Sequence, residues 1–170
     1  MNMTYFELFE IPVQLKVNKA SLVSKFFELS RKYHPDYFVR EFADAQAEAL
    51  EKSALLNKAF KTFQNPDETI KYVLQLKGLL EEEEKYELPP DFLMEVLEIN
   101  EELMDKEELQ NPQLESRITD LQNEIYEPVK EIVEHYQEGT TSEKELLQVK
   151  EYYYKKKYLQ RIQQQLAGKM

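Results

Sequence analysis

The stretch Tyr33-His34-Pro35-Asp36 decides the fold because it separates two long amphipathic patterns, which cover residues 18–33 and 43–63. Pro35 lacks a backbone N–H and biases His34 away from helical dihedral angles, so a helix that reaches this point should stop. The sequence therefore predicts two antiparallel helices joined by a short loop. That loop presents an imidazole and a carboxylate to solvent.

The first of these helices combines an apolar face with a basic flank. Asn18 is a favourable N-cap, and apolar residues then recur at helical spacing: Leu22, Phe26, Leu29 and Tyr33. Lys25 and Lys32 lie one heptad apart on a flank about 90° from that stripe, with Glu28 between them. The exposed flank of the helix is therefore mildly basic.

Two shorter helices complete the first half of the chain. Thr4 can cap a helix that ends near Phe9, and a helix that follows Asn65-Pro66 can end at Gly78. Residues 81–90 contain four consecutive glutamates and then Pro89-Pro90, a composition typical of a join between units.

Three further helical patterns follow, from Asp91, from about Pro112 and from about Ser142. Pro128 predicts a kink in the second of them, and Gly139 predicts its end. The expected fold class is all-α: a helical hairpin plus two short helices over residues 1–80, a linker over 81–90, and a three-helix bundle over 91–170.

The helix from Asp91 carries apolar residues on two opposite sides. One side is an ordinary core stripe of Phe92, Val96, Ile99 and Leu103. The other side, which we call the acidic–apolar patch, consists of Leu93, Met94, Leu97, Glu98, Glu101 and Asp105. Burying unpaired carboxylates would cost several kcal/mol, which favours an exposed docking surface. The alternative is a helix buried on both sides, because apolar stripes usually belong to a core.

The last helix also has a second stripe, formed by Leu147, Tyr154 and Tyr158. From the pattern alone, this stripe could widen the core or continue an exposed patch.

Composition argues against several classes of function. A net charge of -11 disfavours a general nucleic-acid binder, and the absence of cysteine removes thiolate ligands for metals. The three glycines stand alone, so no phosphate-binding loop is present, and we expect no cofactor. His135 has no convergent ligands at helical spacing beyond glutamates, so no metal site is expected. No nucleophile–base pair supports catalysis. Without a membrane-length apolar run, we expect a cytoplasmic protein.

Taken together, the motifs of the first half resemble a J domain, the co-chaperone module that docks on DnaK-class chaperones. The resemblance rests on Tyr5-Phe6-x-Leu8-Phe9, the amphipathic second helix, His34-Pro35-Asp36 and the long third helix. Ile11-Pro12, Phe38 and the later run Asp91-Phe92-Leu93-Met94-Glu95 narrow it to the HscB family.

This resemblance implies a function and a set of docking residues. In the HscB family the J domain engages HscA or a DnaK-like chaperone and stimulates its ATPase, while the C-terminal bundle holds IscU, the iron–sulfur cluster scaffold. Chaperone binding would then involve His34, Pro35 and Asp36, with Lys25 and Lys32 on the basic flank, and Asp36 would contact an arginine. Scaffold binding would involve the acidic–apolar patch, together with Tyr154 where the family uses Phe.

Two departures from the family pattern are Tyr37, where Lys is usual, and Thr69-Ile70, where Arg-Ala is usual. They bear on the affinity for the chaperone. Two alternatives remain open on the sequence: a J-domain protein that serves another client, and a helical adaptor that has no chaperone partner.

Overall fold

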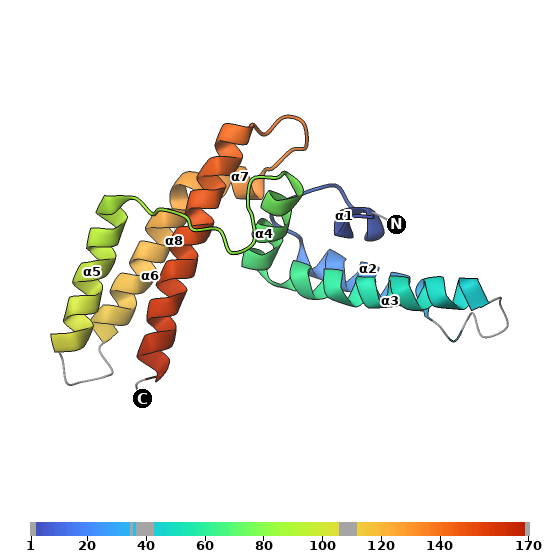
Figure 1. Cartoon of the computed structure of the whole chain (residues 1–170), viewed down its shortest axis with the longest axis horizontal. Coiled ribbons are helices and arrows are strands. Elements are labelled where there is room, and N and C mark those ends of the chain that lie inside the picture. Colours follow the sequence, from blue (N-terminus) through green and yellow to red (C-terminus); the bar gives the residue numbers. More distant parts are fainter. Residues whose placement is uncertain (1–2, 35, 37–42, 106–111, 169–170) are drawn as a thin grey trace. The chain divides into compact units, whose positions relative to one another are not determined.

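The computed structural model describes residues 3–34, 36, 43–105 and 112–168. Every regular element among these residues is helical, which confirms the all-α expectation. The chain divides into two compact units, Met1–Val73 with Tyr136–Thr140 and Leu74–His135 with Thr141–Met170 (Figure 1). In the parts of the chain described, no helix is both long and apolar enough to cross a membrane.

The first unit is built on a helical hairpin. Helix α2 (Lys19–Tyr33) packs along α3 (Ala43–Gln64), as Figure 1 shows. The rings of Phe26 and Phe60 stack with centroids 4.0 Å apart, and the residues buried around them are Leu22, Leu29, Ala49, Leu56 and Ala59. Small residues on α3 allow the close approach of the two helices.

An aromatic cluster attaches the short α1 (Tyr5–Leu8) to the hairpin and to α4 (Pro66–Leu76). Phe63 of α3 lies 4.9 Å from the ring of Phe6 and 5.4 Å from that of Phe9. Tyr5 stacks on Tyr72 at 4.4 Å, and the Tyr5 N–H donates to the Tyr72 hydroxyl over 2.8 Å. One turn of helix has little stability alone, so these contacts hold α1 in place.

Local capping fixes the ends of the helices where the sequence predicts them. Thr4 Oγ1 accepts from the Glu7 N–H at 3.1 Å, and Asn18 Oδ1 accepts from the Ser21 N–H at 3.0 Å. Gly78 adopts a left-handed φ of 70° after α4, where the Leu79 N–H reaches the Leu74 carbonyl at 2.9 Å. That 6→1 bond is typical of a glycine-terminated helix.

The second unit places α5 (Pro90–Asp105), α6 (Pro112–Tyr126) and α8 (Glu143–Gly168) side by side (Figure 1). Its buried residues include Leu74, Leu80, Phe92, Val96, Ile99, Ile118, Leu121, Ile125, Val129, Val133, Leu146, Val149, Tyr152, Tyr153, Leu159 and Ile162. At the N-terminus of α8 Ser142 and Glu145 form a capping box: the Ser142 N–H donates to Glu145 Oε1 at 3.0 Å, and the Glu145 N–H donates to Ser142 Oγ at 3.1 Å.

The middle of this unit follows the predicted break but ends earlier than predicted. Pro128 lies in a 3-10 turn, η2 (Glu127–Val129), between α6 and α7 (Lys130–Glu134). Helix α7 stops at Glu134, not near Gly139, because His135 leaves helical geometry at φ -123° and ψ 28°. Gly139, with φ 84°, lies in a separate turn closed by the Thr140 N–H and the Gln137 carbonyl.

The aromatic cluster yields a test of what holds the first unit together. Replacing buried Phe63 by Ala should lower the free energy of unfolding by about 3–5 kcal/mol, because four ring contacts are lost and a cavity remains. Phe27→Ala is the matched control, because Phe27 is 57% exposed, and it should change the free energy of unfolding by less than about 0.5 kcal/mol. Urea denaturation followed by circular dichroism measures both. Equal losses in the two variants would contradict the cluster's role.

Candidate docking surfaces

The His34–Asp36 segment leaves α2 as the sequence predicts. His34 ends the helix in an extended conformation, with φ -63° and ψ 129°. Its Nδ1 accepts from the Asp36 N–H at 3.2 Å and lies 3.5 Å from Asp36 Oδ2. The Asp36 side chain is 84% exposed, so its carboxylate is available to a partner. Pro35 lies outside the described residues.

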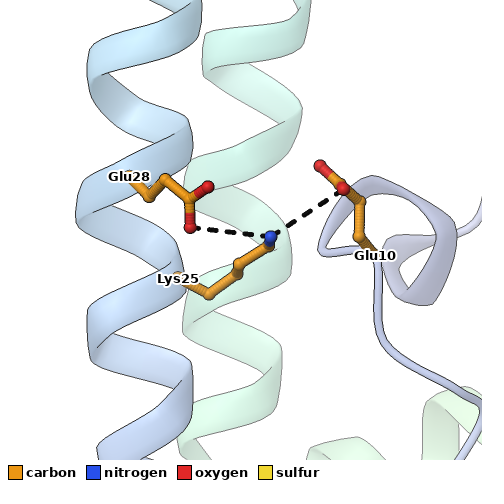
Figure 2. A network of polar contacts seen from close by, with 3 residues as sticks. All are labelled: Glu10, Lys25 and Glu28. Atoms are coloured by element: carbon orange, nitrogen blue, oxygen red, sulfur yellow. Dashed lines mark ion pairs between the residues drawn. The ribbon is translucent and has the colours of Figure 1, made fainter.

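The basic flank of α2 carries more acidic neighbours than the sequence pattern indicates. Lys25 Nζ lies 3.6 Å from Glu28 on its own helix and 3.8 Å from Glu10 in the segment after α1, as Figure 2 shows. Lys32 lies on the same helix, with its Nζ 5.3 Å from the centroid of the Tyr33 ring. Glu28 is visible at i+3, whereas Glu10 is brought close only by tertiary packing.

The acidic–apolar patch is exposed on α5. Leu93, Met94 and Leu97 are 38%, 65% and 56% exposed, and both Glu98 and Glu101 are exposed beside them. Phe92, Val96 and Ile99 on the other side of the same helix are buried, so α5 has a core face and a solvent face. Asp105 ends α5, but its side chain lies outside the described part. Of the two alternatives, a helix buried on both sides is therefore wrong.

Tyr154 packs against the segment before α5. Its ring stacks on Tyr86 with centroids 4.6 Å apart and an interplanar angle of 5°. We call Glu84–Leu88 the strap, because Glu84 also fastens it to α8 through Lys150. The two Lys150–Glu84 distances are 2.8 Å to Oε2 and 3.1 Å to Oε1, and the Lys150 and Glu84 side chains are only 13% and 22% exposed.

Sequence reasoning missed the strap partners of Tyr154. The glutamate run suggested a solvated join, and nothing local distinguishes Glu84 from its three neighbours. The residues of the predicted linker 81–90 instead fall within the second unit, where Glu84 and Tyr86 contact α8.

The strap perturbs the ionisation of Tyr154. Burial, and after it the negative charge of the Glu84 carboxylate, raises the pKa of its phenol from 10.0 to about 12. Both effects disfavour the phenolate.

Metal chemistry has little support in the described residues. Among them no group of three or more His, Cys, Asp or Glu side chains could hold a metal ion. His135 lies 3.5 Å from Glu131 on an exposed surface.

The pKa of Tyr154 predicts a loss of stability in alkali. The folded state holds the neutral phenol, so this contribution is complete below pH 10 and disappears as the pH rises through about 12. Tyr154→Phe cannot ionise, and its free energy of unfolding should fall less steeply over that range than that of the wild type. Denaturant titrations at a series of pH values measure how the free energy of unfolding of each protein depends on pH. The same pH dependence in the wild type and in Tyr154→Phe would contradict the raised pKa of Tyr154.

Comparison with known proteins shows to which family the chain is related. The family profile of the HSCB C-terminal oligomerisation domain matches residues 88–167. The co-chaperone protein HscB homologue of Photobacterium profundum is 33% identical over 124 residues, which cover 72% of this chain and 71% of the relative. The homologue of Vibrio cholerae is 35% identical over 102 residues, 59% of this chain and 60% of the relative.

Solved structures agree with the sequence comparisons. The crystal structure of human co-chaperone protein HscB superposes with a TM-score of 0.77 at 27% identity, covering 99% of this chain and 82% of the human chain. Chaperone HscB from Vibrio cholerae gives a TM-score of 0.63 at 25% identity, covering 97% of this chain and 96% of the other. The chain belongs to the HscB co-chaperone family.

Proposed function

We propose that this protein is a co-chaperone of iron–sulfur cluster assembly. It binds an IscU-like scaffold through the second unit and an HscA- or DnaK-class chaperone through the first, and it stimulates the ATPase of that chaperone. The observation that carries the proposal is the exposure of Leu93, Met94 and Leu97 opposite the buried stripe of α5. The iron–sulfur cluster is the cargo of the scaffold in this scheme.

The physical character of the acidic–apolar patch suits a protein partner. Burying exposed large apolar side chains against a partner stabilises the complex by roughly 25 cal/mol per Å² of apolar surface removed from water. The surrounding Glu98 and Glu101 stay solvated at the rim and select a partner with basic groups opposite them. Because both leucines and the methionine belong to one helix, the helix backbone holds them in a fixed arrangement for a partner.

At the other end of the proposed mechanism, Asp36 contacts the chaperone. Its exposed carboxylate can accept a charge-assisted hydrogen bond from an arginine, and such bonds contribute about 1.5–3 kcal/mol. The Asp36 N–H is occupied by His34 Nδ1, which orders the backbone at this point. A chain that holds both partners raises the effective concentration of the scaffold at the chaperone.

The first test concerns Asp36. The wild-type protein should stimulate the steady-state ATPase of a DnaK-class chaperone from its own cell, and Asp36→Asn should reduce that stimulation about tenfold or more, because the variant keeps the shape but loses the charge. Thermal melting should be unchanged, since the Asp36 side chain is exposed.

The outcomes separate the alternatives. Stimulation without scaffold binding would indicate a J-domain protein with another client. No stimulation by the wild type would leave a helical adaptor and would refute the co-chaperone proposal.

A second test addresses the acidic–apolar patch. Leu97→Ser should weaken binding of an IscU-like scaffold about tenfold, as measured by calorimetry, while leaving the helical content intact because Leu97 is 56% exposed. Leu147→Ser on α8 is the matched control: this leucine is 45% exposed but lies outside the patch, and its loss should leave scaffold affinity unchanged. Equal effects of the two variants would contradict the location of the docking surface.

A further inference from the structure

Lys25 is held between two carboxylates that belong to different segments. Its side chain is 25% exposed, and its Nζ lies 3.6 Å from Glu28 Oε2 and 3.8 Å from Glu10 Oε2. Figure 2 shows the ammonium group pointing into the space between the two acidic side chains. One positive charge therefore faces two negative charges, and this part of the α2 flank is not electropositive.

Glu10 occupies a backbone position that disfavours it. Its φ of 56° lies in the left-handed region, where the β-carbon of an L-residue is crowded and glycine is favoured. The surrounding hydrogen bonds close the end of α1: the Glu10 N–H reaches the Glu7 carbonyl at 3.1 Å, and the Ile11 N–H reaches the Phe6 carbonyl at 3.0 Å. This is the helix-terminating position in which glycine is the common residue. The chain instead carries a side chain there, and that side chain reaches Lys25.

The two carboxylates are not equivalent. Glu28 belongs to the same helix as Lys25 and forms an ordinary i,i+3 pair with it. Glu10 comes from the turn after α1, and the aromatic cluster on either side of Phe63 holds that turn in place through Phe9 and Phe6. Its carboxylate is consequently a second, independently positioned negative charge at the flank that the proposed function assigns to the chaperone.

We propose that Glu10 shields Lys25 and thereby weakens the docking of an acidic chaperone surface on α2. The inference rests on the proposed chaperone binding. An acidic partner that approaches Lys25 also approaches the Glu10 carboxylate, which is 55% exposed, and the like-charge repulsion slows association and reduces affinity. Glu10 thus slows formation of the chaperone complex, and the effect weakens as salt screens the charges.

The experiment compares charge-removing substitutions of equal shape. Glu10→Gln keeps the β-carbon and the strained backbone but removes the charge. The concentration of this protein that half-maximally stimulates a DnaK-class ATPase should fall about threefold at low salt, and the gain should vanish at high salt. In a Lys25→Gln background the same Glu10→Gln change should produce no gain, because the shielded cation is gone.

Glu83→Gln is the matched control. Glu83 also has a left-handed φ, 58°, and its substitution changes the net charge of -11 by the same amount, but it lies outside the α2 flank and should leave the half-maximal concentration unchanged. An equal gain from Glu83→Gln, an equal gain in the Lys25→Gln background, or no gain from Glu10→Gln would each overturn the shielding. A wild-type protein that stimulates no chaperone would instead overturn the proposed function, and the shielding with it.

Discussion

The packing of α2 on α3 through the Phe26–Phe60 stack is the contact on which the first candidate docking surface depends. It holds the two long helices side by side. His34, which precedes Pro35, leaves α2 in an extended conformation, and the Asp36 carboxylate is exposed to solvent. The position of α2 depends on this packing, because a helix in a protein gains most of its stability from the tertiary contacts of its apolar face.

In the second unit, too, core packing determines which side chains are exposed. Helix α5 buries one stripe through Phe92, whose ring lies 6.5 Å from that of Tyr158 on α8, and this commits the opposite stripe to solvent. The strap adds a constraint of a different kind. Its Glu84–Lys150 pair is largely removed from water, where the loss of one partner leaves an uncompensated charge. Tyr154 is consequently part of a packed aromatic contact with Tyr86 and not a free side chain on α8.

The flank of α2 and the acidic–apolar patch on α5 differ in charge. The chain has a net charge of -11, so basic side chains are outnumbered by acidic ones over the whole sequence. One basic residue of α2, Lys25, lies between two carboxylates. The acidic–apolar patch on α5 has the sign of the net charge, whereas on the flank of α2 the Lys25 cation is paired with Glu10 and Glu28. Surfaces of unequal charge favour partners of different charge, because complementary potentials attract and like potentials repel.

The amino-acid sequence by itself determined the helices, the extended exit at His34 and the two-sided character of α5, because caps, proline and periodicity act within one or two helical turns. The sequence did not predict that α7 ends as early as Glu134. Only the tertiary structure decided that the second face of α5 is exposed, that Tyr86 covers Tyr154, and that Glu10 reaches Lys25. Those contacts join segments that are separate in the sequence, and no local pattern encodes which side chains packing brings together.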